Sequence, residues 1–414
     1  YLGGFAGALA NSYTVDCSLS VTGAITGSGS HVGGWAGVGA IGWATDLGKD
    51  NTNDTTLLGG VTDLLGSLLS SGGDTTALLS LAGVSPSAIM GCQINSVSLT
   101  VHADGDYAGG FVGNGNGLLL TPATAEYLNK LTYWKSNTIT GSPSEGSNKL
   151  AGLSAVTANG NYAGGIAGSL GGASVGGLLN DTVGLGEFLG FTVDGVVLAE
   201  PYTVVAKEYA GGAVGLAVGG TVKNVDLQAL EKVSAENMAG GFVGAGGPGS
   251  LADTNGLSLN LLGLDHLLTV GGLLNVIPGI KLELENCTVS GAGEGYIVEA
   301  IGHDTPTVEY VAGGFIARSN STNMTNCHAD KLKSVTADNA QGYAGGFVGI
   351  SRTGDLADLG DLRDSEGALI AVNDLLGTIG TMVPDYTNCT VTYTNGGYVQ
   401  ADVAGGFAGD FQGG

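Results

Sequence analysis

Basic residues are scarce in this sequence. The 414 residues include 13 lysines and arginines against 37 aspartates and glutamates, a formal net charge of -24. A nucleic-acid-binding protein needs positive side chains to neutralise phosphates, so this balance excludes nucleic acid as a partner. An excess of carboxylates favours solubility instead, and carboxylates are also ligands that calcium prefers.

Long apolar runs are missing as well. No uninterrupted stretch of about 18 apolar residues offers a membrane span, and the first residues, YLGGFAGALANS, lack the basic start of a signal peptide. The sequence opens with YLGGFAG and closes with VAGGFAGDFQGG, so both ends lie inside one motif. We therefore expect a piece of a longer protein or a mature processed product.

The sequence is rich in glycine, and the glycines repeat. There are 78 of them, about 19% of the chain against roughly 7% in an average protein. AGGFVG and its variants occur nine times, with their first glycines at Gly3, Gly33, Gly109, Gly164, Gly211, Gly240, Gly313, Gly345 and Gly405. Before each motif come two further β-prone segments, such as NCTVSG and SVTADNAQGY, separated by turn residues. Three short strands per unit of about 30 residues predict an all-β chain: a right-handed parallel β-helix, or solenoid, of about nine coils over 1–414.

The alternation within the motif predicts which side chains face inward. Period 2 places Tyr343 and Phe347 on one face and Ala344 and Val348 on the other. The Val348 position holds only Ala, Val or Ile in all copies, which suits a narrow interior. We expect the aromatic face to be covered from outside, because both faces are apolar.

Insertions between the compact units supply candidates for that cover. We predict helical or loop insertions at approximately 41–88, 115–150, 170–192, 248–280 and 351–384. The stretch 55–69 has leucines at helical spacing, 256–277 and 356–379 are similarly leucine-rich, and Thr121 with Pro122 predicts a helix start that runs through Trp134. We expect these helices to pack on one face of the solenoid.

The fold should depend most on the glycine motifs and on a cysteine position that recurs between them. The best-formed motifs are Gly109, Gly110 and Phe111; Gly240, Gly241 and Phe242; and Gly345, Gly346 and Phe347. The five cysteines all occupy one repeat position: Cys17, Cys92, Cys287, Cys327 and Cys389. No paired CxxC spacing indicates zinc, and side chains on adjacent rungs lie farther apart than a disulfide prefers. We predict a buried ladder of mostly reduced thiols.

The recurring AGGFVG, preceded by segments such as NCTVSG, resembles the GLUG-type glycine motif of large secreted bacterial surface proteins. These include adhesin-like proteins and the non-catalytic parts of some bacterial IgA peptidases. The resemblance covers nearly every compact unit. It implies a parallel β-helix on an exported, extracellular, cell-surface protein, and it carries over no catalytic residues because the motif has none.

One loop is a candidate for metal binding. The segment DLGKDNTNDTT at 46–56 gathers Asp46, Asp50 and Asp54 beside two asparagines, a donor set that suits calcium. The spacing does not match an EF-hand, so a solvated loop is the favoured interpretation. We expect no other cofactor.

The leading functional hypothesis is a structural or adhesive repeat region that acts as a rigid stalk or a ligand-presenting surface. Its partner would be an extracellular glycan or protein, or another copy of the chain. One alternative is a self-assembling extracellular fibre subunit. A second is a polysaccharide-active β-helix enzyme, which the shortage of basic residues and the scattered histidines disfavour, so we expect no enzyme.

Overall fold

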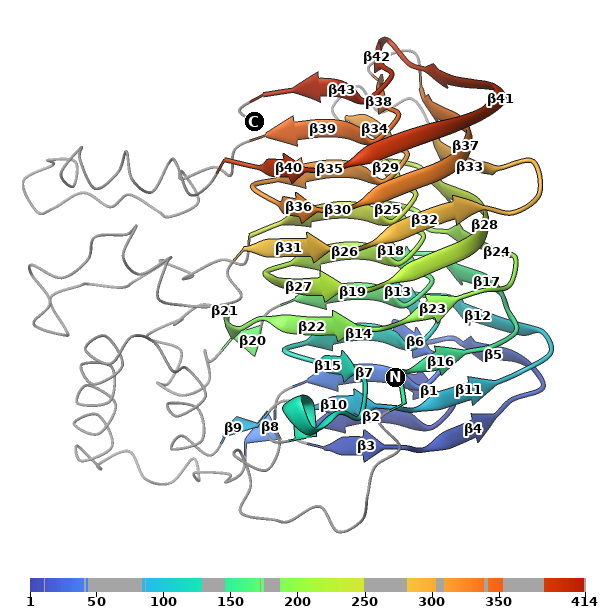
Figure 1. Cartoon of the computed structure of the whole chain (residues 1–414). Helices are drawn as coiled ribbons and strands as arrows, with labels where there is room; N and C mark the ends of the chain where they lie inside the picture. The colour runs from blue at the N-terminus through green and yellow to red at the C-terminus, as the bar shows by residue number, and fades with distance from the viewer. Residues whose placement is uncertain are drawn as a thin grey trace, which may run out of the picture.

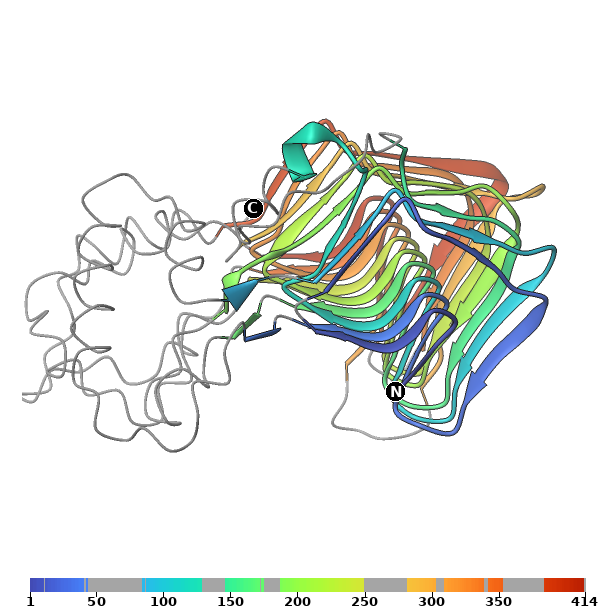
Figure 2. The same ribbon diagram turned by 90° about the horizontal axis from the view of Figure 1, so that it is seen from below.

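The chain is a right-handed parallel β-helix, as the repeat predicts. The computed structural model describes residues 1–10, 12–40, 42–43, 84–85, 87–128, 146–171, 173–174, 187–248, 281–302, 309–338, 342–352 and 383–412. In Figure 1 the strands at the front run to the right, those at the rear run to the left, and the colour rises from blue to red. The coils therefore climb from the N-terminus with a right-handed turn, and Figure 2 shows the coil end-on.

In the described ranges, four parallel sheets form the walls, and the coil passes through them in the order A, B, C, D. Sheet A has nine strands: β1 (Leu2–Gly3), β6 (His31–Gly33), β13 (Tyr107–Gly109), β18 (Tyr162–Gly164), β25 (Tyr209–Gly211), β29 (Met238–Gly240), β34 (Tyr310–Gly313), β38 (Gly342–Gly345) and β42 (Val403–Gly405). Sheet B also has nine: β2 (Ala6–Ala10), β7 (Ala36–Ala40), β14 (Val112–Asn116), β19 (Ala167–Gly171), β26 (Val214–Val218), β30 (Val243–Gly247), β35 (Ile316–Asn320), β39 (Val348–Arg352) and β43 (Ala408–Phe411).

Sheets C and D complete each coil. Sheet C has eight strands: β3 (Tyr13–Val15), β10 (Ala88–Met90), β15 (Leu119–Thr121), β22 (Phe191–Asp194), β27 (Gly220–Lys223), β31 (Leu282–Glu285), β36 (Asn323–Thr325) and β40 (Asp385–Thr387). Sheet D has thirteen: β4 (Ser18–Ser20), β5 (Gly23–Gly27), β11 (Gln93–Asn95), β12 (Leu99–Ala103), β16 (Lys149–Leu150), β17 (Leu153–Ala158), β23 (Val197–Leu198), β24 (Tyr202–Val205), β28 (Asp226–Ala235), β32 (Thr288–Gly291), β33 (Tyr296–Ala300), β37 (His328–Ala337) and β41 (Thr390–Gln400).

Equivalent residues of successive coils pair with one another. Tyr107 pairs with Tyr162, and Gly109 with Gly164, in the same parallel register. Each glycine motif ends a strand of sheet A, so the nine motifs found in the sequence correspond to the nine strands of that sheet. The repeat in the sequence is therefore the repeat of the coil.

The glycine motif is a sharp bend, and this corrects the predicted orientation of its aromatic residue. The chain turns at Gly346 and Phe347, between β38 and β39, so the period-2 alternation breaks there. Phe347 is fully buried in the main core together with Ala344 and Val348. The prediction that Phe347 shares the outer face with Tyr343 is wrong, because the bend turns its side chain inward.

The second glycine of each motif lets one coil lie directly on the next. A Cβ on Gly241 would overlap the carbonyl oxygen of Gly314, and one on Gly314 would overlap that of Gly346. The first glycine is required within its own coil, since a Cβ on Gly109 would overlap the carbonyl oxygen of Val112. A side chain is thus excluded from both positions by backbone contact.

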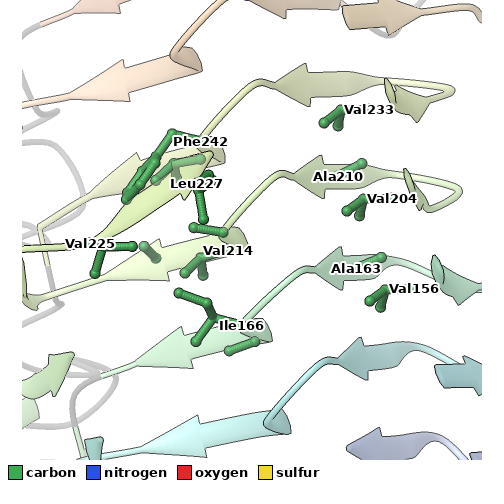
Figure 3. Packing of buried hydrophobic residues seen from close by; sticks show 14 of the residues in the cluster. Val156, Ala163, Ile166, Val204, Ala210, Val214, Val225, Leu227, Val233 and Phe242 are labelled. Atoms are coloured by element: carbon green, nitrogen blue, oxygen red, sulfur yellow. The ribbon is translucent and has the colours of Figure 1, made fainter. Parts of the chain in front are cut away.

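The interior is filled by ladders of identical or similar side chains. Val156, Val204 and Val233 repeat along sheet D, while Ala163 and Ala210 repeat along sheet A (Figure 3). At the bend, Phe242, Phe315, Phe347 and Phe407 stack with ring centroids 4.8 to 4.9 Å apart. We call these four residues the inner phenylalanine stack.

The cysteine position lies at the corner between sheets C and D and forms the predicted ladder. All five cysteines are free thiols; Cys92, Cys287 and Cys327 are buried, whereas Cys17 and Cys389, on the first and last coils, are partly exposed. Two members of the ladder were not predicted: Asn148 and, in the next coil, the fully buried Val196. Register places Asn148 beside Cys92, and it is fully buried.

The residue before the cysteine position, which Val225 occupies in one coil, adopts a left-handed conformation in most coils. Asn224, Asn286, Asn326 and Asn388 have φ between 52° and 54°. Their side chains form a chain of hydrogen bonds along the surface, in which Asn388 Nδ2 donates to Asn326 Oδ1 (2.7 Å) and Asn326 Nδ2 donates to Asn286 Oδ1 (3.0 Å). Asparagine tolerates this conformation better than most residues, which explains its recurrence before the cysteine.

The structure also revises the expected insertions. Residues 115–116 end β14 and residues 119–121 form β15, so the excursion in that coil leaves after sheet C. Its helix begins at Ala125 and is described as far as Leu128, with the Leu128 amide donating to the Thr124 carbonyl. Thr121 ends β15 and does not cap the helix. Two antiparallel pairs, β8 (Gly42–Trp43) with β9 (Val84–Ser85) and β20 (Ala173–Ser174) with β21 (Glu187–Leu189), flank other excursions. The helices predicted at 55–69, 256–277 and 356–379 lie outside the described residues.

Candidate functional site

A row of aromatic side chains runs along the outer face of sheet A. We call it the outer aromatic row: Tyr1, His31, Tyr107, Tyr162 and Tyr209. Tyr1 precedes β1, and the others open β6, β13, β18 and β25, so in-register pairing brings them together. Strand periodicity turns this first position outward, because the next residue, such as Ala108 or Ala163, faces the core.

The rings of this row stack along the solenoid axis. Ring centroids are 4.4 Å apart for His31 and Tyr107, 4.9 Å for Tyr107 and Tyr162, and 5.3 Å for Tyr162 and Tyr209. The interplanar angles are 17° to 20°, while Tyr1 meets His31 edge-on. Because the faces cover one another, a ligand on this surface would meet ring edges and hydroxyl groups.

Burial favours the uncharged forms of these groups further. Partial burial, helped by the neighbouring Tyr107 and Tyr209 and by nearby carboxylates, raises the pKa of Tyr162 to about 12. The pKa values of Tyr107 and Tyr209 are also raised, mainly by burial. Burial, together with the positive N-terminus, lowers the pKa of His31, and its buried Nδ1 has no hydrogen-bond partner among the described residues. At neutral pH the row therefore offers neutral phenols and an imidazole.

Polar residues border the row on the side of sheet D. Asp106, Asn161 and Glu208 each precede a tyrosine of the row. Each of their carbonyls accepts a hydrogen bond from the amide at the row position of the next coil, as Asp106 does from Tyr162 (2.6 Å). A carboxylate, an amide and a carboxylate thus follow one another along the border, one in each coil. Such a border can accept and donate hydrogen bonds to a polar, uncharged ligand.

Beyond Tyr209 the same register position becomes mainly aliphatic. Met238 and Val311 follow Tyr209, and they cluster with Ala245, Ala317 and Ile350 from sheet B. The aromatic character returns at Tyr343, which packs against this cluster. The row is therefore confined to the first five coils, and an apolar strip continues it.

Two arginines on sheet B share one carboxylate beside that strip. Arg318 on β35 and Arg352 on β39 lie 3.2 and 3.1 Å from the Glu309 carboxylate. Arg352 also lies 3.9 Å from Asp410 on β43. The arginines are neutralised by these carboxylates and tie three successive coils together.

A second polar cluster, which the sequence did not reveal, fixes the short helix to sheet C. Tyr127 donates a hydrogen bond to Asp194 Oδ2 (2.7 Å), and Asn224 Nδ2 donates to Asp194 Oδ1 (2.8 Å). Lys223 Nζ lies 3.5 Å from Asp194 and 5.6 Å from the centre of the Tyr127 ring. Tyr127 and Asp194 are both buried, so this cluster holds the excursion against the wall.

The residues singled out in the sequence divide into two groups. The motif glycines, Phe111, Phe242, Phe347 and the cysteines all lie in the wall or the core, where they determine architecture. Asp46, Asp50 and Asp54, the calcium candidates, lie outside the described residues. Within the described part of the chain, no group of three or more His, Cys, Asp or Glu side chains is placed to hold a metal ion.

Comparison with known proteins returned no match: no family model, curated protein or solved structure is significantly similar to this chain. In the part of the chain that the structure describes, no helix is both long enough and apolar enough to cross a membrane.

Proposed function

We propose that this chain is the rigid repeat region of an exported bacterial cell-surface protein. It acts as a stalk that carries a ligand-presenting surface, the outer aromatic row. The observation that carries the proposal is the uninterrupted stack of nine coils, in which four sheets continue in register. At about 4.8 Å per coil this stack is roughly 40 Å long.

Rigidity follows from how the coils are joined. Every inner strand has a hydrogen-bonded neighbour on both sides, and the inner core is continuous from the first coil to the last. To extend the rod along its axis, a force must therefore break hydrogen bonds between coils in all four sheets at once. The acidic composition supports a solvent-exposed location, and the resemblance to the GLUG-type repeat supports export.

The outer aromatic row is the best-supported recognition surface. It is regular over five coils, uncharged at neutral pH, and bordered by hydrogen-bonding side chains. Half-buried tyrosines with carboxylates and amides nearby suit an extracellular glycan or a polar protein segment.

Location can be tested on intact cells that produce the protein from its own gene. We expect an external protease to digest the chain while a cytoplasmic marker remains whole. If the chain were protected until the cells were lysed, export would be rejected.

Recognition can be tested with a glycan array and the purified chain. A variant with Tyr107→Ala and Tyr162→Ala should lose whatever signal the wild type gives. Val97→Ala is the matched control, because Val97 is 90% exposed and outside the row. Equal signals from the wild type and the double variant would reject the row as the binding surface.

A further inference from the structure

The outer faces of sheets A and B are turned towards one another. Each glycine motif bends towards the inside of the coil, where Phe347 is buried, so the two sheets meet at an angle that opens outwards (Figure 2). Met238 of sheet A and Ala245 of sheet B belong to one cluster on this side. A Cβ on Gly215 would lie 2.8 Å from the Tyr209 carbonyl oxygen, so no side chain fits between the sheets at the bend. The outer aromatic row therefore faces the outer side of sheet B.

Two polar side chains of sheet B lie on the side that faces the row. Strand pairing aligns Asn114 on β14 with Ser169 on β19. The same register position holds Leu216 and then Ala245 in the next two coils. Because Ala245 clusters with the outer residues of sheet A, register places Asn114 and Ser169 on that outer side as well. The row thus has hydrogen-bonding side chains on the sheet opposite it, in the coils that also carry Tyr107 and Tyr162.

The polar groups on both sides are unpaired among the described residues. No side-chain hydrogen bond to another described residue is made by Tyr107, Tyr162, Tyr209, Asn114 or Ser169. Elsewhere such groups are used by the fold: the Tyr202 hydroxyl donates to the Gly212 carbonyl (3.0 Å), and the asparagines before the cysteine position bond to one another. Free hydrogen-bonding groups therefore gather on the two facing sheets, where a ligand can use them.

Charge restricts the class of ligand. The phenols, the amide and the hydroxyl of this surface are neutral, and each can both donate and accept hydrogen bonds. Phosphate, sulfate or carboxylate groups on a ligand would be repelled by the Asp106 and Glu208 carboxylates beside the row and by the net charge of -24. The surface therefore suits a neutral ligand rich in hydroxyl groups.

The spacing of the row restricts the ligand further. It offers one phenol per coil from Tyr107 to Tyr209, with ring centroids 4.9 and 5.3 Å apart. Each sugar of an extended β-1,4-linked chain advances by nearly the length of one coil and carries hydroxyl groups along both edges. An extended protein segment advances about 3.3 Å per residue, so its side chains on one face recur about every 6.6 Å and lose step with the coils. The repeat therefore favours a linear glycan over a protein segment.

We propose that a neutral, linear β-1,4-linked glycan binds along the rod axis between the outer aromatic row and sheet B, with one sugar per coil. The phenols from Tyr107 to Tyr209 bond to one edge of the chain, and Asn114 and Ser169 bond to the other. His31 continues the row by one coil, so the site spans four sugars. This inference rests on the proposed role of the row in recognition and names its ligand class; it does not depend on export.

The test is isothermal titration calorimetry of the 414-residue chain with sugar hexamers. The probes are the cello-, xylo-, manno- and chito-hexaoses, which share the β-1,4 linkage. We expect at least one of them to bind, and within its series affinity should rise with length up to about four sugars and then level off, because the site spans four coils. Maltohexaose, whose α-1,4 linkage curves the chain, should bind about 10-fold more weakly because it loses hydrogen bonds to the outer coils.

Single-group variants test the contacts without disturbing the wall. Tyr162→Phe keeps the stacked ring and removes one free hydroxyl, so it should weaken the bound hexamer about 3–10-fold and leave thermal unfolding unchanged. Asn114→Ala should weaken it by a similar factor from the other side. Tyr343→Phe is the matched control, because Tyr343 holds the same register position on β38 beside the aliphatic cluster, outside the site, and it should bind like the wild type.

Three results would overturn the inference: no binding of any β-1,4 hexamer, equal binding of maltohexaose, or unchanged binding by Tyr162→Phe. Tighter binding of an octapeptide rich in serine, threonine and asparagine would overturn it in favour of a protein segment. In each case the glycan array with the Tyr107→Ala and Tyr162→Ala double variant shows separately whether the row recognises another ligand. If it does, recognition by the row stands and only the linear glycan is rejected; if the array shows no ligand, both are rejected.

Discussion

The inner phenylalanine stack and the outer aromatic row are built by the same repeat but lie on opposite sides of one wall. Both place rings close to 4.8 Å apart, the spacing that strand pairing imposes. Phe315 is fully buried in the core, whereas Tyr162 keeps part of its ring and its hydroxyl group at the surface. Stacking geometry therefore comes from the backbone, while burial decides whether a stack stabilises the fold or remains available to a ligand.

The two stacks should differ most in how much stability is lost when one ring is replaced by alanine. Phe315→Ala should lower the free energy of unfolding by about 3–5 kcal/mol, because it leaves a cavity among fully buried residues. Tyr162→Ala should cost about 1 kcal/mol, since stacking is lost but the site remains open to water. Denaturant unfolding followed by far-ultraviolet circular dichroism measures both, and equal losses would contradict the assignment of inside and outside.

A smaller effect is expected at Asn148, which interrupts the cysteine ladder. Its Oδ1 accepts the Cys92 amide (2.7 Å), and its Nδ2 donates to the Ile89 and Thr121 carbonyls (3.0 and 2.9 Å). Asn148→Ala should cost about 1–3 kcal/mol by leaving buried backbone groups unpaired. Asn95→Ala, on the exposed surface, is the control and should be nearly neutral; a neutral Asn148→Ala would show that the bonds are dispensable.

The rate at which each thiol reacts with a thiol reagent should depend on its position along the rod. Burial raises the pKa of Cys92, and the hydrogen bond with Cys287 is the main reason that the pKa of Cys327 is raised. Because the thiolate is the reactive form, these thiols should react slowly in the native protein. Denatured, unreduced protein should release five reactive thiols, with Cys17 the fastest in the native state. Recovery of three or fewer thiols would reveal a disulfide and contradict the reduced ladder.

The smallest expected effect is a change in the ultraviolet titration of Tyr162. The pKa of Tyr162, raised to about 12, should give a late step in the ultraviolet titration of tyrosine that Tyr162→Phe removes. In the unfolded chain the phenol ionises near 10, so above that pH the unfolded state binds fewer protons than the folded state. The stability that this group contributes is complete below pH 10 and is lost as the pH rises towards 12. If Tyr162→Phe left the late step of the titration in place, Tyr162 would be solvated in the native protein, contrary to its partial burial.

The sequence predicts the coil well because strand pairing is periodic. The nine glycine motifs and the single cysteine position are visible as repeats, and the structure places each in register. The sequence predicts the wrong face for Phe347 because the alternation rule assumes a continuous strand. The residues around Gly345 and Gly346 carry no sequence signal that predicts a bend. Asn148 was missed because it follows a long excursion and shares no motif with the cysteines. The outer aromatic row depends on which face of β13 or β18 is covered, which only the assembled wall decides.

Each second glycine is required by the coil stacked upon it. The direct measurement is the free energy of unfolding of two alanine variants, Gly241→Ala inside the rod and Gly406→Ala at its end, at a protein concentration where the chain is monomeric. A Cβ at Gly241 would overlap the Gly314 carbonyl and lie 2.7 Å from the Tyr296 ring, whereas one at Gly406 meets nothing within 4 Å. We expect Gly241→Ala to lower the free energy of unfolding by about 1–3 kcal/mol and Gly406→Ala to leave it unchanged. Equal losses at the two positions would contradict it.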